Sequence, residues 1–362
     1  MNEKLKIAVV GGGQGRAHSA AFNSMPDLFE LHAICDINVA RARDIAETFH
    51  IPHVTTAIDE LYCMADVDVI DLCTPSYLHY RQTLDALEAG KHVICEKPIA
   101  GSLQQVDELI AAKTQSGKKV MPIFQYRFGH GLQKLKWLRD QGLTGRAYLT
   151  TSETAWQRGP DYYAVPWRGK WQTELGGALV TLSVHAHDVV CYILGPAKSV
   201  GAHVATLVNP IETEDTVSVS LQMADGSLAS LSVTTGSVHQ ISRQRFCFSN
   251  MTAESNQQPY SNTRDDWTFT GDTPEKQEQI AAALERFEPL PEGYAGQFYR
   301  YYQDMQSGQP FSVTLADARA SVELITAIYH SARTRQMVEL PIQAGHPLYA
   351  GWQPEQAQSF TT

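Results

Sequence analysis

A glycine-rich turn directly after the first apolar run limits the folds that this chain can adopt. The run Leu5–Val10 leads straight into the sequence GGGQGR at residues 11–16, and a segment with helical spacing follows. A strand, a glycine turn and a helix N-terminus suit a dinucleotide's pyrophosphate, because glycines let the backbone approach it and helix N–H groups bind it. The residues of this turn that we expect to bind a dinucleotide are Gly11, Gly13, Gln14, Gly15 and Arg16.

The dinucleotide interpretation gains support from Asp36, which ends the second apolar run. An acidic residue roughly 20 to 25 positions beyond the glycines accepts hydrogen bonds from the adenosine ribose and repels a 2′-phosphate. The sequence therefore favours NAD over NADP, although Arg41 and Arg43 can in principle receive that phosphate. The third glycine, Gly15, comes one residue earlier than in G-x-G-x-x-G. A plain tight turn is the alternative.

Short apolar runs alternate with helical segments through the first third of the chain. The runs are residues 5–10, 31–35, 69–73, 92–95 and 119–123, and one of the helical segments is 77–90. Continuous apolar strands between helices indicate a parallel sheet that is buried on both faces. We predict an N-terminal Rossmann domain with a doubly wound parallel sheet.

The pattern changes in the second part of the chain. Residues 216–223 and 228–233 alternate strictly around a turn, which indicates an antiparallel hairpin. Helical spacing returns at 294–307 and 315–335, whereas 250–292 has no pattern that we can assign. Because 362 residues exceed one usual core, we predict an NAD-binding domain at 1–125. The rest, 126–362, is predicted to be a second domain that contains this hairpin; the family resemblance given below implies that it is an α+β domain for substrate binding and oligomerisation, with a large, mainly antiparallel open sheet.

Charge and composition exclude several classes of partner. The formal net charge is −10, so no broad positive field favours nucleic acid. No stretch reaches the ~20 apolar residues of a membrane helix, and the N-terminus does not resemble a signal peptide. We therefore expect a cytoplasmic protein. The six cysteines have no metal-ligand spacing, so we expect no metal site and interpret them as reduced, buried small side chains.

Several further motifs carry a resemblance to one family. They are Thr74-Pro75-Ser76 with His79, Glu96-Lys97-Pro98, Tyr126-Arg127-Phe128, Trp167-Arg168, Lys170-Trp171, Gly176-Gly177 through Asp188, and Glu212 to Asp215. With the glycine turn and Cys35-Asp36, they span nearly the whole chain. The sequence resembles the glucose-fructose oxidoreductase, inositol dehydrogenase and rhizopine-catabolism (Gfo/Idh/MocA) family.

The resemblance implies further contacts to the cofactor. For Arg127, a structural salt bridge is an equally weighted alternative. For His79, the alternative is a plain position on the surface of a helix. The residues concerned are Thr74, Pro75, His79, Glu96, Lys97 and Arg127.

Lys97 and His185 are the catalytic pair that the resemblance implies. An ammonium beside an alcohol stabilises developing alkoxide character. A histidine, which titrates near neutral pH, can take the hydroxyl proton. A solvated lysine at a strand end and a packed core histidine are the alternatives.

Thr181 is the third predicted catalytic residue. It stands where the family commonly has aspartate four residues before the histidine. We expect one helix over 178–194 that carries Thr181, His185 and Asp188 on one face. Because a hydroxyl cannot raise the basicity of a histidine as a carboxylate does, the mechanism depends mainly on Lys97 and His185.

A polar and aromatic stretch at residues 156–171 is the candidate substrate site. Aromatic faces stack on sugar C–H surfaces, while Arg and Lys bind hydroxyls or an anionic substituent. An interface or core segment is the alternative. The candidate substrate contacts are Arg158, Tyr163, Trp167, Arg168 and Lys170, together with Lys97 and His185.

These residues imply an NAD-dependent dehydrogenase of a sugar, sugar derivative or cyclitol, with NADP as the less favoured cofactor. Two alternatives stay open: glycoside cleavage through a bound NAD redox cycle, and a non-catalytic NAD-binding sensor. The resemblance also implies a homodimer or homotetramer that assembles through the open face of the second sheet. The sequence does not identify the particular substrate.

Overall fold

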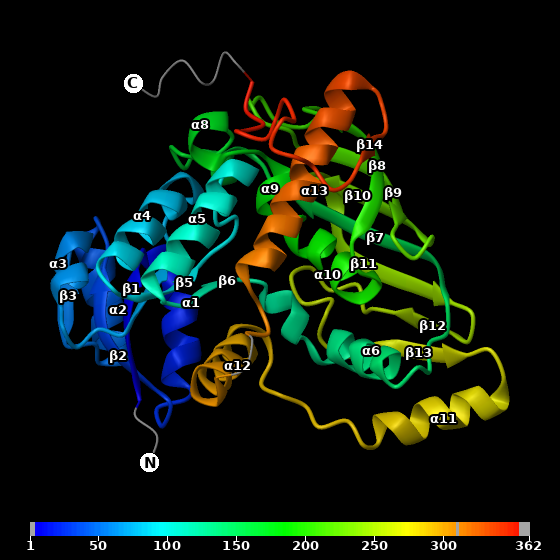
Figure 1. Cartoon of the computed structure of the whole chain (residues 1–362), viewed down its shortest axis with the longest axis horizontal. Helices are drawn as coiled ribbons and strands as arrows, with labels where there is room; N and C mark the ends of the chain where they lie inside the picture. The colour runs from blue at the N-terminus through cyan, green and yellow to red at the C-terminus, as the bar shows by residue number, and fades with distance from the viewer. Residues whose placement is uncertain (1–3, 309–310, 355–362) are drawn as a thin grey trace. The chain divides into compact units, whose positions relative to one another are not determined.

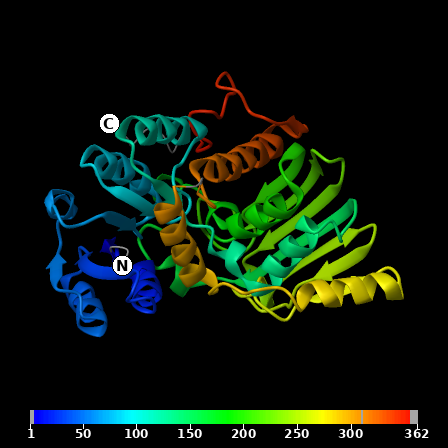
Figure 2. The ribbon, with the colours of Figure 1, turned by 60° about the horizontal axis from the view of Figure 1, so that its bottom comes forward.

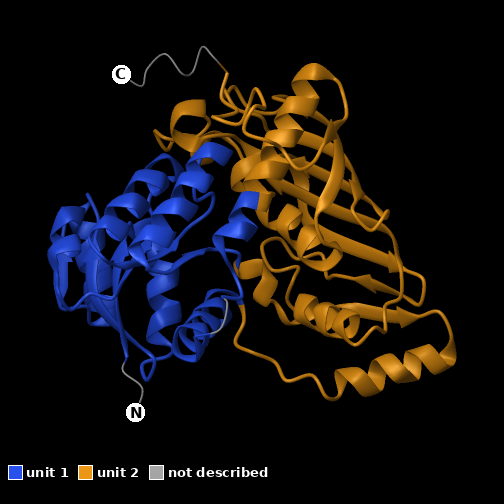
Figure 3. Ribbon diagram, in the orientation of Figure 1, with its two compact units in different colours: residues 1–124, 293–319 blue, residues 125–292, 320–362 orange. Residues whose placement is uncertain are grey.

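The chain forms two compact units in the computed structural model, which describes residues 4–308 and 311–354 (Figure 3). Unit 1 comprises Met1–Phe124 and Gly293–Arg319, and unit 2 comprises Gln125–Glu292 and Ala320–Thr362. The first boundary falls one residue from the predicted one. The segment Gly293–Arg319, however, belongs to unit 1 and not to a continuous second domain. Residues 355–362 of the predicted second domain lie outside the described residues.

Unit 1 contains a six-stranded sheet in the order β3-β2-β1-β4-β5-β6, with every neighbouring pair parallel (Figure 1). This strand order is that of a Rossmann sheet, so the predicted fold is confirmed. The sequence analysis missed β3, a short polar strand at the edge of the sheet. The strands are β1 (Leu5–Val10), β2 (Phe29–Cys35), β3 (His53–Thr55), β4 (Val69–Leu72), β5 (His92–Cys95) and β6 (Val120–Pro122).

Helices connect these strands and begin or end at residues with suitable side chains or backbone angles. Asn38 caps the start of α2 and Ser102 caps the start of α5, each by accepting a backbone N–H with its side chain. Gly117 ends α5 in the left-handed conformation. The helices are α1 (Gly12–Asn23), α2 (Val39–Phe49), α3 (Ile58–Cys63), α4 (Ser76–Glu88) and α5 (Leu103–Ser116).

Helix α12 (Gly293–Ser307) explains why a late segment belongs to unit 1. Phe298 stacks on Phe22 of α1, with ring centroids 4.0 Å apart and an interplanar angle of 4°. The Gln297 amide bonds to the backbone around the end of β6, accepting from Phe124 N at 3.0 Å and donating to the Pro122 carbonyl at 2.8 Å. Long-range packing of this kind leaves no trace in local periodicity.

Unit 2 contains an eight-stranded sheet in the order β13-β12-β11-β7-β10-β9-β8-β14. Among the described strands of this sheet, only β7 and β10 pair in parallel, so the prediction of a large, mainly antiparallel sheet is confirmed. Strands β9 and β10 form the predicted hairpin. The strands are β7 (Ala147–Gln157), β8 (Ala197–Ala205), β9 (Thr216–Met223), β10 (Leu228–Thr234), β11 (Gly236–Phe248), β12 (Met251–Glu254), β13 (Thr268–Gly271) and β14 (Val338–Glu339).

One face of this sheet is covered by helices, including α6 and α10 (Figure 2). Alternate residues of β9 are buried and exposed, and Ser218, Ser220 and Gln222 lie on its exposed face. The helices of unit 2 are η1 (Gln125–Phe128), α6 (His130–Asp140), α7 (Pro160–Tyr163), α8 (Trp171–Glu174), α9 (Ala178–Thr181), α10 (Val184–Leu194) and α11 (Pro274–Leu284), and α13 (Leu315–Thr334) continues from unit 1 into it.

The described helices and cysteines bear on two of the compositional expectations. No single described helix is long and apolar enough to cross a membrane; Trp171–Thr181 and Val184–Leu194, bent by 49°, pass that test only as a pair. All six cysteines are free, and those that end strand runs in unit 1 are buried as expected. The expectation is wrong for Cys63, which ends helix α3 and is exposed, and Cys191 and Cys247 are only half-buried.

Candidate functional site

The glycine turn after β1 has the local geometry that a phosphate group requires. Gly11 has a φ of 93°, and a Cβ on it would lie 2.7 Å from the carbonyl oxygen of Cys73, so only glycine fits there. Helix α1 begins at the next residue and has no side-chain cap. Apart from its chain neighbours and the backbone of its own helix, no described atom lies within 4 Å of the Cβ position of Gly13. The helix N-terminus therefore fits an anionic group at the carboxyl edge of the sheet.

Asp36 holds this turn from the end of β2. Its Oδ2 accepts a hydrogen bond from Gly12 N at 2.6 Å, and its Oδ1 accepts one from Asn38 N at 2.7 Å. The Arg41 Nε lies 2.9 Å from Oδ2, so the predicted phosphate-binding arginine is paired with the predicted ribose-binding carboxylate. Arg16 likewise contacts Asp44 on α2.

The Thr74-Pro75 and Glu96-Lys97-Pro98 segments are tied together by His79. This buried imidazole lies 2.7 Å from the Pro98 carbonyl through Nδ1 and 2.7 Å from the Thr74 carbonyl through Nε2. It is therefore not a surface residue of α4. The segments follow β4 and β5, and ligands of open α/β sheets bind beyond such carboxyl ends. Lys97 is half-buried, and its backbone N donates to Glu96 Oε2 at 3.0 Å.

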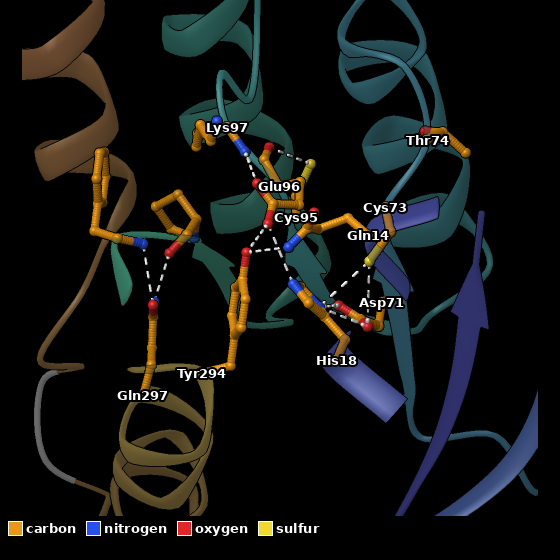
Figure 4. Close-up of polar contacts among 12 residues, drawn as sticks. Gln14, His18, Asp71, Cys73, Thr74, Cys95, Glu96, Lys97, Tyr294 and Gln297 are labelled. Atoms are coloured by element: carbon orange, nitrogen blue, oxygen red, sulfur yellow. Dashed lines mark hydrogen bonds and ion pairs between the residues drawn. The ribbon is translucent and has the colours of Figure 1, made fainter. Parts of the chain in front are cut away.

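A buried polar cluster beside this edge was missed by the sequence analysis. His18 lies between Asp71 and Glu96, and Tyr294 donates to the same glutamate at 2.8 Å (Figure 4). His18, Asp71 and Cys73 also have donor atoms that all lie within 4.8 Å of one another. The available signal was an aspartate inside the apolar run 69–73, because a buried charge requires a partner.

The structure corrects the prediction of one helix over 178–194. Helix α9 ends at Thr181 and α10 begins at Val184. The backbone N–H groups of Leu182 and Ser183 both point to the Ala178 carbonyl, at 3.2 and 2.9 Å, so the regular hydrogen-bond ladder stops there. Thr181 and His185 therefore lie on different helices, and the offset of four residues no longer places them on one face.

Glu214 holds the start of α9. Its Oε1 accepts from Gly177 N and Leu179 N, both at 2.9 Å, and Tyr329 donates to its Oε2 at 2.8 Å. A Cβ on Gly177 would lie 1.8 Å from the Glu214 carbonyl, which makes glycine necessary there. Burial raises the pKa of Glu214 to about 7. Thr181 donates to the Gly177 carbonyl at 2.9 Å, so its hydroxyl belongs to this same turn.

His185 lies on α10 with 5% of its surface exposed. Its ring stacks on Tyr126, with centroids 4.5 Å apart and an interplanar angle of 14°. One turn further, Asp188 accepts from Arg127 through both oxygens, at 2.8 and 2.5 Å. This buried pair is the salt bridge that the sequence analysis weighed against a cofactor contact for Arg127.

His187, two residues from His185, has no hydrogen-bond partner for either ring nitrogen among the described residues. It is buried, and burial lowers its pKa to about 3. The folded state therefore excludes a proton that the unfolded state binds below its ordinary pKa of 6.5. Stability is lost as pH falls from that value towards 3.

Replacing His187 by leucine is therefore expected to reduce the acid sensitivity of folding. Between pH 8 and pH 5 the wild type should lose about 2 kcal/mol more than His187→Leu, since one pKa unit corresponds to ~1.4 kcal/mol. Urea unfolding at both pH values measures this difference. His203→Leu, at an exposed position of β8, is the control and should retain the wild-type pH dependence. Equal pH dependence of His187→Leu and wild type would contradict the prediction.

A cluster of aromatic rings surrounds Arg158 in unit 2. Its guanidinium carbon lies 5.2, 5.0 and 5.4 Å from the ring centroids of Trp156, Tyr162 and Tyr260. Arg168 lies over the Tyr162 ring at 4.0 Å but is neutralised by Glu174 at 3.1 Å. No carboxylate among the described residues pairs with Arg158, and its buried Nε has no described hydrogen-bond partner.

The other predicted substrate contacts lie in the same stretch. Trp167 stacks on the Arg168 guanidinium at 4.3 Å. Tyr163 ends α7 and is half-buried, whereas Lys170 is exposed immediately before α8. The predicted residues thus divide between the units: Lys97 and the glycine turn belong to unit 1, and His185 and the Arg158 cluster belong to unit 2.

A Rossmann unit with this glycine turn, followed by an α+β unit, is an arrangement found among nucleotide-dependent oxidoreductases. Residues 5–124 match the model of an oxidoreductase family with an NAD-binding Rossmann fold, and residues 132–252 match the GFO/IDH/MocA C-terminal domain. These segments together make up more than half of the chain, which therefore belongs to the Gfo/Idh/MocA family.

Individual relatives match at moderate identity. The chain is 34% identical over 203 residues to the D-glucoside 3-dehydrogenase of Escherichia coli (strain K12), covering 55% of this chain and 57% of that protein. It is 35% identical over 149 residues to the inositol 2-dehydrogenase of Rhodococcus erythropolis, covering 40% and 42%. The match thus spans little more than half the length of the first relative and less than half of the second.

A solved structure matches over a greater length. The WlbA dehydrogenase from Bordetella pertussis, in complex with NADH and UDP-GlcNAcA, superposes with a TM-score of 0.83 at 27% identity. The superposition covers 94% of this chain and 100% of that one.

Proposed function

We propose that this protein is an NAD-dependent oxidoreductase that transfers a hydride between nicotinamide and a secondary hydroxyl of a sugar, sugar derivative or cyclitol. The observation that carries the proposal is the carboxyl edge of the six-stranded sheet. There the open glycine turn follows β1, and Glu96-Lys97-Pro98 follows β5. A site for a dinucleotide and an ammonium group on one sheet edge suit the oxidation of an alcohol.

The proposed roles follow from the chemistry of each side chain. Lys97 stabilises developing alkoxide character on the substrate oxygen. His185 takes the hydroxyl proton as a general base. NAD, when bound, supplies the hydride acceptor. Thr181 is the weakest member of the set, because its hydroxyl belongs to the Gly177 turn.

The proposed cofactor-binding residues are the turn Gly11, Gly13, Gln14, Gly15 and Arg16, with Asp36 and Arg41, then Thr74, Pro75, His79, Glu96 and Lys97. For Arg127, the buried pair with Asp188 favours a structural role over a cofactor contact.

A carbohydrate or cyclitol is the substrate class that the relatives support, since a glucoside dehydrogenase and an inositol dehydrogenase are among them. The rings around Arg158 offer faces on which sugar C–H surfaces stack. The proposed substrate contacts are Arg158, Tyr163, Trp167, Arg168 and Lys170, with Lys97 and His185.

A panel of neutral sugars, uronates, sulfonated sugars and inositols, each with NAD, tests the proposal by NADH absorbance. Oxidation of at least one hydroxyl compound with equimolar NADH is the expected result. Release of free sugar from glycosides at constant NADH would instead indicate the redox-assisted cleavage. NAD binding with no turnover on the whole panel would favour a sensor.

We expect NADH to bind more tightly than NADPH, because the buried Asp36 carboxylate repels a 2′-phosphate and pairs with Arg41. Asp36→Ser should shift the ratio of the two dissociation constants towards NADPH by at least ~10-fold. The hydroxyl introduced by this substitution can still accept a hydrogen bond from Gly12 N. Fluorescence titration at fixed ionic strength measures both constants. Asp27→Ser, at an exposed position, is the control. Tighter NADPH binding by the wild type would overturn the preference.

Arg158→Met is expected to separate anionic from neutral substrates. A charge-assisted hydrogen bond to a carboxylate, sulfonate or phosphate group contributes roughly 1.5–3 kcal/mol, so KM for such a substrate should rise by ~10 to 100-fold. KM for a neutral sugar should change by less than ~3-fold. Steady-state kinetics on both kinds of substrate measure the difference. A uniform rise would assign Arg158 to packing rather than to anion recognition.

The proposal extends to assembly and location. The polar outer face of β9 is compatible with a homodimer or homotetramer that assembles through the open sheet. Light scattering coupled to size exclusion distinguishes these states. Six free cysteines suit the reducing cytoplasm.

A further inference from the structure

His18 lies inside unit 1 with a carboxylate against each ring nitrogen (Figure 4). Its Nδ1 is 3.1 and 3.0 Å from the two oxygens of Asp71, and its Nε2 is 3.2 Å from Glu96 Oε1. His18 and Asp71 are fully buried, and Glu96 is 6% exposed. An ionised carboxylate offers only lone pairs, so each ring nitrogen must carry a proton to bond both. The geometry therefore describes an imidazolium between two carboxylates.

The charges of the cluster agree with this assignment. Burial alone would lower the pKa of His18, but Asp71 and Cys73 together raise it well above its ordinary value. Burial raises the pKa of the Cys73 thiol, which lies 3.3 Å from His18 Nδ1 and so remains protonated. Burial, followed by the charge of Glu96, raises the pKa of Tyr294. One cation thus faces two anions, with neutral Cys73 and Tyr294 beside them.

Glu96 connects this cluster to Lys97. Its Oε1 contacts His18 and accepts from the Tyr294 hydroxyl, while its Oε2 accepts from the backbone N of Lys97 at 3.0 Å. Tyr294 in turn accepts from the Gln14 side chain at 2.7 Å. The Glu96 carboxylate is thereby held by His18 of helix α1, by Tyr294 of helix α12 and by the backbone N–H of Lys97.

We propose that His18 is a positioning residue: it orients Glu96, and Glu96 holds the backbone amide of Lys97, so that the ammonium group keeps its place at the sheet edge. Tyr294 serves the same carboxylate and links it to the glycine turn through Gln14. The inference rests on the proposed catalytic role of Lys97 for its kinetic consequence. The structural part of the inference is that the backbone amide of Lys97 is held in an ordered position, and this part does not depend on whether the protein turns over a substrate.

A divalent metal on His18, Asp71 and Cys73 is the competing interpretation, since their donor atoms lie within 4.8 Å of one another. A carboxylate on the far nitrogen, as Glu96 provides, is also common for metal-bound histidines. The direct contacts of 3.0 and 3.3 Å from Nδ1 to Asp71 and Cys73, however, are hydrogen bonds that satisfy the same atoms without an ion. We therefore favour the protonated ring, and metal content becomes an outcome of the test.

Two variants of different severity, His18→Gln and Tyr294→Phe, test the proposal. The first removes the imidazolium, and the second removes only one contact to Glu96 and leaves the buried ion pair intact. Tyr301→Phe is the matched control, because Tyr301 lies on the same helix and its buried hydroxyl has no described hydrogen-bond partner. Hydrogen exchange at the Lys97 amide should become at least ~10-fold faster in both test variants and not in the control.

Kinetics and spectroscopy complete the test. We expect kcat to fall by up to ~10²-fold in His18→Gln and less in Tyr294→Phe, with KM for NAD little changed, as expected for a displaced catalytic group. Nitrogen NMR of the wild type at pH 8 should show protons on both ring nitrogens of His18.

Three results would each overturn the inference: a neutral His18 ring, one equivalent of bound metal, or unchanged Lys97 exchange in both variants. A wild type that is inactive on every substrate would instead refute the proposed function, and the exchange and NMR results would still decide the role of His18.

Discussion

Lys97→Met is expected to lower kcat by ~10² to 10⁴ on the best substrate of the panel. Methionine keeps the length and apolar stem of lysine but removes the charge that we propose to stabilise the alkoxide. NADH binding should weaken by no more than ~10-fold, because the proposed pyrophosphate and ribose contacts come from the glycine turn and Asp36 rather than from the Lys97 ammonium. Single-turnover absorbance measurements and fluorescence titration separate the two effects.

Lys113→Met is the matched control for this prediction, since Lys113 lies in the last turn of α5 in the same unit. It should retain wild-type turnover. If Lys97→Met kept more than a tenth of wild-type kcat, the assignment of Lys97 to the reacting oxygen would be wrong. If it lost NADH binding altogether, Lys97 would belong to the cofactor site alone.

Apolar runs predicted β1, β2, β4, β5 and β6 because those strands are largely buried on both faces. β4 is an example, since all four of its residues are buried. The apolar runs did not reveal β3, because it is a three-residue edge strand in which His53 and Val54 are exposed. Periodicity reports burial, so a polar edge strand leaves no pattern.

The same reading of apolar periodicity could not predict a break between two helices or a contact between distant parts of the chain. The apolar pattern continues through residues 178–194 because both helices are buried, although the hydrogen-bond ladder stops at residues 182–183. Helix α12 was predicted from its periodicity, but its packing in unit 1 depends on the contact between Phe298 and Phe22, which are far apart in sequence. Local spacing defines an element and not its partner.

In the candidate site, too, local spacing predicted some residues, whereas other contacts form only when distant side chains come together. The glycine turn and Asp36 were predictable, because a strand, a turn and an acidic residue at fixed spacing have one common use. The ion pair between Asp36 and Arg41 and the His18 cluster depend on side chains brought together by folding. Asp71 was the visible signal, as a charge in the middle of an otherwise apolar strand.

His185→Asn is the second prediction with a large expected effect. Of the two neighbours that the sequence suggested for His185, Asp188 pairs with Arg127 and the Thr181 hydroxyl donates to the Gly177 carbonyl. In the proposed mechanism the imidazole carries the proton transfer, so its removal should lower kcat by ~10² to 10⁴. Asparagine keeps a polar group of similar size beside Tyr126, so the fold should persist.

The pH profile distinguishes a general base from a packed core histidine. If His185 takes the hydroxyl proton, the acidic limb of kcat/KM should disappear in His185→Asn, and added imidazole should restore part of the rate to His185→Ala. His203→Asn, at an exposed position of β8, should keep the wild-type profile. Loss of activity together with a lowered Tm and an unchanged acidic limb would assign His185 to the packing of α10 against Tyr126. The proton would then have to leave through another group, because Thr181 cannot act as a base near neutral pH.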